Sequence, residues 1–278
     1  LSAKNACGFK LLSAKAERQG KRKTMEDASV LLDNLANEFT NLSGTWGFYA
    51  VYDGHGGSNT SSICSNMLHR QLCNSNKLTE NIKGAFQIAY KETDAFALKE
   101  SESKGFKDGS TAVTALIRAN TLHIANAGDS EAVLCKVNQS GVAEAIVVSE
   151  IHRPTNVAEK QRIEKAGGAV FSGRVFGALA VSRSLGDGDF KIPISEANFV
   201  SAEPYYNSHP LTKEHTFLLL ACDGLFDKLS PQESITFVHE RLTSGVSLSD
   251  AAEQLADLAI EKQTTDNVTV VIVQFNWK

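Results

Sequence analysis

Trp46-Gly-Phe-Tyr-Ala-Val-Tyr-Asp53-Gly54-His55-Gly-Gly57 is the stretch of sequence around which we interpret the rest of the chain. Its apolar part predicts a strand, and its end brings a carboxylate, a glycine-rich backbone and an imidazole to one place. Such a combination is typical of a metal site or an anion site. The alternative, for an isolated Asp-Gly pair, is a strand-to-helix turn in which Asp53 caps the next helix.

The composition is that of an ordinary globular protein. Of the 278 residues, 42% are hydrophobic and 22% are charged, so a large core can form. The formal net charge of -4, with Lys21-Arg22-Lys23 as the one basic run, argues against nucleic acid as a partner. No apolar segment approaches the ~20 residues that cross a bilayer, so we expect no membrane span. We expect a single domain over 1–278 and a monomer.

The cysteines are widely spaced, odd in number and without a CxxC pair, which predicts neither a disulfide framework nor a zinc cluster. Buried thiols in a reducing compartment favour the cytoplasm or the nucleus. The sequence starts at Leu1 rather than at a methionine, which leaves room for targeting signals outside it. The five cysteines are Cys7, Cys64, Cys73, Cys135 and Cys222.

Strands and helices are predicted in separate runs along the chain. We therefore expect an α/β domain of the α+β type, a sheet sandwich covered by helices rather than a doubly wound parallel sheet. The segment from 167 to 197 is rich in glycine, serine and charge, which predicts a functional flap. Apolar spacing predicts helices over 59–72, 78–99, 156–166, 231–242 and 248–262, one or two strands within 8–32, and further strands over 111–117, 121–126, 131–135, 142–149, 216–222 and 268–275.

Carboxylates stand at the ends of four apolar strands, and we expect those ends to meet at the same edge of a sheet. Oxygen ligands without accompanying His or Cys pairs favour Mg²⁺ or Mn²⁺ over Zn²⁺. Converging acidic groups repel one another, so more than one divalent ion is needed, which predicts a two-metal hydrolytic centre. An arginine nearby would hold a phosphate, and a histidine would protonate the departing oxygen. The four residues are Asp53, Asp129, Asp223 and Asp266.

Two further acidic residues, Glu26 and Asp27, follow Arg22 in the sequence. Alternation along a strand would point the two carboxylates to opposite faces, so we expect only one of them to be a direct metal ligand. The alternative is a solvated charge cluster on a loop.

Seven short motifs occur in order along the chain, and together they resemble those of the metal-dependent type 2C protein serine/threonine phosphatases. Each motif alone is weak, but seven in order over about 8–275 form a specific signal. The motifs are Arg22-x-x-Met25-Glu26-Asp27, Val51-Tyr-Asp-Gly-His-Gly-Gly57, Gly109-Ser-Thr-Ala112, Asn126-Ala-Gly-Asp-Ser130, Leu179-Ala-Val-Ser-Arg-Ser-Leu-Gly-Asp187, Ala221-Cys-Asp-Gly224 and Asp266-Asn-Val-Thr269.

The resemblance implies a four-layer α/β/β/α sandwich of two antiparallel sheets flanked by helices, with a flap subdomain over about 150–198. It also implies two Mn²⁺ or Mg²⁺ ions between the sheets, which activate a hydroxide for in-line attack on phosphoserine or phosphothreonine of phosphorylated protein substrates. By this resemblance Asp53 bridges the ions, while Asp223, Asp266 and the Gly54 carbonyl complete direct ligation. Glu26 and Asp27 act mostly through bound water.

The same resemblance assigns the remaining roles. Arg22 holds the substrate phosphate and His55 is the general acid. Asp129 with Asp223 binds a weaker third ion. Arg174 lies near the cleft, and Cys222 is a core residue rather than a nucleophile.

The sequence departs from the family pattern at four positions, none of which is a primary metal ligand. Ile151 stands where the family commonly has Asp in Asp-His-Lys-Pro, and Glu131 stands where Gly-Asp-Ser is usually followed by Arg. Phe176 replaces a usual Asn, and Asp108 replaces a small residue. These changes bear on flap geometry, on the affinity for a third ion and on substrate preference.

Two alternative functions remain open at this point. A pseudophosphatase would keep the fold as a binding or scaffold module, but we would then expect substitutions among the metal ligands, Arg22 or His55, because unpaired converging carboxylates are costly. A hydrolase for small phosphoesters would share the centre and differ in the width of the cleft.

Overall fold

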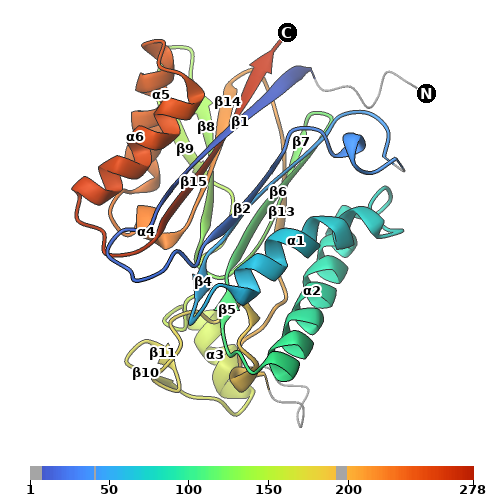
Figure 1. The fold of residues 1–278 in the computed structure, drawn as a ribbon. Helices are drawn as coiled ribbons and strands as arrows, with labels where there is room; N and C mark the ends of the chain where they lie inside the picture. The colour runs from blue at the N-terminus through green and yellow to red at the C-terminus, as the bar shows by residue number, and fades with distance from the viewer. Residues whose placement is uncertain (1–7, 41, 192–198) are drawn as a thin grey trace.

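Two five-stranded antiparallel sheets form the middle of the molecule (Figure 1). The computed structural model describes residues 8–40, 42–191 and 199–278. The first sheet has the order β1 (Phe9–Arg18), β15 (Val268–Trp277), β14 (His215–Ala221), β8 (Glu131–Val137) and β9 (Ala143–Val147). The second has the order β13 (Tyr205–Pro210), β7 (Thr121–Ala127), β6 (Ala112–Arg118), β3 (Trp46–Tyr52) and β2 (Ala28–Leu32).

Pairs of helices cover the outer face of each sheet (Figure 1). The helices α5 (Pro231–Thr243) and α6 (Leu248–Glu261) pack on the first sheet, and α1 (Asn59–Asn74) and α2 (Ile82–Lys104) pack on the second. The four-layer sandwich expected from the sequence is therefore confirmed. Among the described residues, no helix combines the length and the apolar character needed to cross a membrane.

The strand β3 explains why an uninterrupted apolar run opens the key stretch of sequence. Phe48 and Tyr52 face the helices α1 and α2, whereas Tyr49 and Val51 face the opposite sheet, where they meet Leu220. All seven residues of the strand are buried. A strand that is covered on both faces has no solvent side on which polar residues could alternate.

The patterns of the sequence located most of these elements, and each predicted helix and strand outside the flap is present within a few residues. The predicted link between β6 and β7 is a tight hairpin in which Arg118 pairs with Thr121. The strand β13 was not predicted, because its polar sequence is half exposed at a sheet edge and ends in Pro210.

The flap lies below the strand ends in Figure 1 and has little regular structure. It contains α3 (Val157–Lys165) and the short strands β10 (Val170–Phe171) and β11 (Arg174–Val175), packed around a small cluster of Ile163, Val175, Phe199 and Val200. Residues 192–198 of the predicted flap, like Cys7, lie outside the described residues. A three-stranded sheet of β12 (Leu185–Gly186), β5 (Gly109–Ser110) and β4 (Gly54–His55) ties the end of the flap to the Asp53 turn.

Candidate metal centre

The predicted acidic residues meet where strand ends of both sheets come together. Asp53 follows β3 of the second sheet, whereas Asp223 follows β14 and Asp266 precedes β15 in the first. Our expectation that all four carboxylates share the edge of one sheet was therefore wrong. Two sheets packed face to face bring their strand ends together, and Asp129 lies in the connection that crosses from β7 of the second sheet to β8 of the first.

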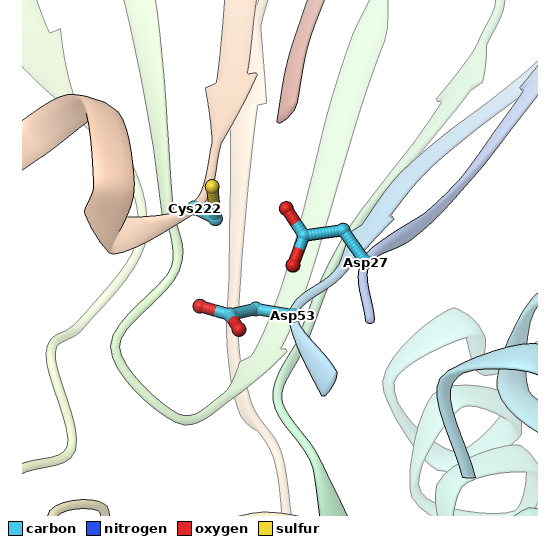
Figure 2. Close-up of side chains that lie close together, drawn as sticks. All are labelled: Asp27, Asp53 and Cys222. Atoms are coloured by element: carbon cyan, nitrogen blue, oxygen red, sulfur yellow. The ribbon is translucent and has the colours of Figure 1, made fainter. Parts of the chain in front are cut away.

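Three side chains form the tightest group in this region, and Figure 2 shows them facing one another. One ligand atom each from Asp27, Asp53 and Cys222 lies within 4.8 Å of the other two. Asp27 Oδ2 accepts a hydrogen bond from Thr269 Oγ1 at 2.7 Å, whereas its buried Oδ1 has no partner among the described residues. An orphaned carboxylate oxygen in a buried acidic cluster is where a cation would be expected.

The sulfur atom in this group behaves as a core thiol. Cys222 Sγ donates to the carbonyl oxygen of Asn267 at 3.4 Å and accepts from the Thr269 amide at 3.1 Å. Burial raises the pKa of this thiol well above its ordinary value, and the neighbouring acidic groups raise it further. Cys222 therefore stays protonated, and the oxygen atoms are the ligands left for a metal ion.

The ionised form of the carboxylates in the centre is electrostatically unfavourable. Burial, followed by repulsion from neighbouring acids, raises the pKa of Asp53 well above its usual range and that of Asp223 to about 7. Burial also raises the pKa of Asp27 to about 6. A hard divalent cation would favour the ionised carboxylates, so the donor set fits an ion with oxygen ligands.

Gly54 lets the Asp53 turn approach the neighbouring segment closely. A Cβ atom at this position would lie 2.3 Å from the carbonyl oxygen of Glu26. The side chain of Glu26 turns away toward α1, where its Oε2 accepts from the Gly57 amide at 3.1 Å, whereas Asp27 points toward β15. The two acidic side chains thus contact different segments of the fold, although neither residue lies within a strand.

Arg22 lies at the open side of the centre. Its Nη2 is 2.5 Å from Asp266 Oδ2, and its side chain remains 58% exposed, so the guanidinium has donors free to face solvent. The other oxygen of Asp266 accepts the Asn267 amide at 2.8 Å. An arginine in this position can bind a phosphate without leaving the acidic group that holds it.

His55 is held by an acidic residue to which the sequence gave no role. Its Nε2 lies 2.8 Å from Asp187 Oδ2, which also accepts the Ser184 hydroxyl at 2.5 Å. Although burial lowers the pKa of His55, the hydrogen bond and charge of Asp187 outweigh this effect and raise it. The contact needs a glycine beside it, because a Cβ at Gly109 would lie 2.1 Å from Asp187 Oδ2.

Asp108, one of the departures from the family pattern, caps the helix that follows the Asp53 turn. The side chain of Ser58, at the N-cap position of α1, makes no capping hydrogen bond. Asp108 is buried and accepts instead from the amides of Asn59 at 2.9 Å and Thr60 at 3.2 Å. A carboxylate at this position satisfies free helix amides and complements the helix dipole.

Asp129 has a cationic partner, as Asp266 has Arg22. Arg153 Nε donates to its Oδ2 at 2.8 Å, and Arg153 Nη2 lies 3.1 Å from Asp227 Oδ1 and 3.9 Å from Asp223 Oδ2. Arg153 was given no role from the sequence, although it stands at the lysine position of the Asp-His-Lys-Pro motif in which Ile151 replaces the aspartate.

Arg174 is held within the flap. Its guanidinium donates from Nη1 to the carbonyl oxygen of Ala178 at 2.8 Å. Its placement near the cleft stays a prediction. The neighbouring Phe176 has a left-handed backbone, with φ of 48°, which explains why an asparagine would suit this position, and its ring packs edge-on against Phe199.

A two-sheet sandwich with acidic residues gathered at the shared strand ends fits a metal-dependent hydrolase. The profile of the protein phosphatase 2C family matches residues 13–268. The chain belongs to this family of metal-dependent serine/threonine phosphatases.

Similar proteins support this assignment along nearly the whole chain. Spalten of Dictyostelium discoideum is 38% identical over 97% of this chain, which spans 28% of the length of spalten. The human integrin-linked kinase-associated serine/threonine phosphatase 2C is 37% identical over 96% of this chain and 73% of its own length. The crystal structure of a phosphatase from a pathogenic strain of Toxoplasma gondii has a TM-score of 0.81 at 26% identity, covering 97% of this chain and 94% of the other.

Proposed function

We propose that this chain hydrolyses phosphoserine and phosphothreonine in protein substrates at a centre of two Mn²⁺ or Mg²⁺ ions. The observation that carries the proposal is the half-buried group of Asp27, Asp53 and Asp223, whose pKa values are all raised. The pKa values stay raised although Thr269 donates to Asp27 and Arg153 lies 3.9 Å from Asp223, so keeping these groups acidic without a bound cation costs stability. The pseudophosphatase alternative would have no reason to retain this cost.

In this proposal the acidic residues bind the ions and Arg22 binds the substrate phosphate. Asp53, Asp223, Asp266 and the Gly54 carbonyl hold the ions, with Glu26 and Asp27 acting through water. The ions, when bound, supply an activated water and a clamp for in-line displacement at phosphorus. Arg22 binds the phosphate oxygens through the donors that Asp266 leaves free.

His55 gives a proton to the departing serine or threonine oxygen. Asp187 engages Nε2, so the proton passes from Nδ1, and the Asp187 charge keeps the ring protonated until it is needed. Replacing His55 with Ala should slow hydrolysis of a phosphothreonine peptide by about 100-fold or more while leaving an aryl phosphate nearly unaffected, because only the poor leaving group needs the proton. Equal losses on both substrates would count against a general-acid role.

The direct test is phosphate release from a phosphothreonine peptide and an aryl phosphate, with Mn²⁺, with Mg²⁺ and with chelator. We expect release from both substrates only with metal. A folded protein that binds Mn²⁺ and releases no phosphate would favour the pseudophosphatase, whereas turnover of aryl phosphate alone would favour small phosphoesters.

We also propose the compartment, the oligomeric state and a further substrate contact of the enzyme. Cys64, Cys73, Cys135 and Cys222 are buried and form no disulfide within the described part of the chain, which supports a reducing compartment such as the cytoplasm or nucleus. We propose that the chain acts as a monomer, because its one centre is built from its own residues. Arg174 is proposed to contact substrate from the flap.

A further inference from the structure

The acidic group at the outer side of the centre already contains a cation from the chain itself. The Arg153 guanidinium lies among three carboxylates, at 2.8 Å from Asp129, 3.1 Å from Asp227 and 3.9 Å from Asp223. Its Nε and Nη2 bind different carboxylates, so one planar group bridges two connections of the fold. Asp129 and Asp223 are the two residues that the sequence analysis assigned to a weaker third ion.

The backbone fixes Arg153 in this position. The amide of His152, the preceding residue, donates to the carbonyl oxygen of Gly128 at 3.0 Å, beside Asp129. The amide of Asn156 donates to the Arg153 carbonyl oxygen at 2.9 Å, and its side-chain amide donates to Ile151 at 2.5 Å. The loop is therefore bound on both sides of Arg153, and its side chain starts next to the acidic group rather than reaching it from a distance.

The surroundings favour an arginine over a metal ion. The Asp129 side chain is only 5% exposed, so its charge needs compensation on the spot, and Arg153 supplies it. Ile151, on the same loop, offers no oxygen ligand. An ion that bound Asp129 and Asp223 would have to displace the guanidinium, with which its charge would clash.

We propose that Arg153 is a resident cation that takes the place of a third metal ion, positioning Asp129 and steadying Asp223. The residues present therefore do not fit the third ion expected from the sequence. The inference rests on the proposed two-ion centre, which Arg153 leaves intact. As a positioning residue, Arg153 acts through Asp223 and does not touch the substrate.

The test is to count Mn²⁺ ions by titrating metal-free protein and measuring free Mn²⁺ by electron paramagnetic resonance. Wild type should bind two ions per chain. Arg153→Met keeps much of the side-chain volume and removes the charge, so it should bind one more, weaker ion and melt at a lower temperature in chelator. Adding Asp129→Asn to this variant should abolish the extra ion.

Two controls separate the possible failures. Arg70→Met removes an arginine on the surface of α1 and should change neither count nor melting temperature. Arg153→Lys places the residue common in the family at this position, and because a single ammonium group does not bridge two carboxylates as the planar guanidinium does, it should admit the extra ion, which serves if the methionine variant does not fold. Three ions in wild type, or two in Arg153→Met, would overturn the proposal, whereas no ion in wild type would overturn the two-ion centre itself.

Discussion

Glu159 in the flap and Asp223 at the strand ends are both acidic side chains with limited exposure to solvent. Their pKa values are nevertheless shifted in opposite directions. Burial raises the pKa of each, but Arg183 and Arg162 reverse the effect at Glu159 and lower its pKa to about 2. At Asp223 the acidic neighbours add to the effect of burial, and the pKa reaches about 7. The charged partners of an acidic side chain, rather than its burial, therefore decide whether its pKa is lowered or raised.

The difference separates acids that build the fold from acids that bind a ligand. Both oxygens of Glu159 accept from arginines, with Arg183 Nη2 at 2.7 Å and Arg162 Nη2 at 3.0 Å. Asp27, by contrast, has a buried oxygen without any partner among the described residues. The chain satisfies the structural acid Glu159 itself and leaves an oxygen of Asp27 for a cation.

The largest effect that would test this comparison is the loss of Asp223. Asp223→Asn removes a charged ligand, so we expect metal-dependent phosphate release to fall by at least about 100-fold at saturating Mn²⁺. The same change relieves repulsion, so the melting temperature in chelator should rise. Asp189→Asn, at an exposed acid paired with Lys107, is the matched control and should change neither. Full activity of the Asp223 variant would sink the metal assignment.

The pH dependence of the centre sharpens the comparison further. Because the folded-state pKa of Asp223 is raised to about 7, the native protein binds more protons than the unfolded chain between about pH 4 and 7. The stability of metal-free protein from this group therefore falls as the pH rises through that window. Mn²⁺ must displace the proton, so its affinity should rise up to about tenfold per pH unit below 7 and then level off.

Calorimetric Mn²⁺ titrations between pH 5.5 and 8, with melting curves in chelator at each pH, would check both trends, and these pH values span the range around the raised pKa of about 7. Affinity that does not change with pH would mean that Asp223 is already ionised in the metal-free protein. In Asp223→Asn the dependence should weaken, leaving contributions from Asp27, whose pKa is about 6, and from Asp53, whose pKa is raised well above its usual range.

Sequence patterns located the acidic residues at the strand ends and missed the partners that hold the neighbouring side chains, for a physical reason. Continuous apolar runs locate β3 and β14, and the residues at their ends, Asp53 and Asp223, follow directly. The residues that hold these side chains in place can lie far away in the chain. Asp187 is 132 residues from His55, and nothing in the local sequence indicates the contact. Hydrogen-bond partners depend on tertiary packing, which periodicity does not encode.

The smallest effect concerns the flap acid, and it should have the opposite sign in pH. Glu159→Gln removes the charge that binds Arg183 and Arg162, so we expect a loss of about 2 kcal/mol of stability at neutral pH. Since the folded pKa of Glu159 is lowered to about 2, its contribution is full above about pH 4.5 and disappears as the pH falls toward 2.

Denaturant unfolding of Glu159→Gln and wild type, at pH 7 and at pH 3, would measure this loss and its decline with acid. Glu164→Gln is the matched control, because this acid lies on the same helix in an exposed pair with Lys160 at 3.8 Å and should cost almost nothing. Mn²⁺ affinity should stay unchanged in both variants. If Glu159→Gln instead weakened Mn²⁺ binding as much as Asp223→Asn does, the division between structural and ligand acids would not hold, since a flap acid would then be part of the centre.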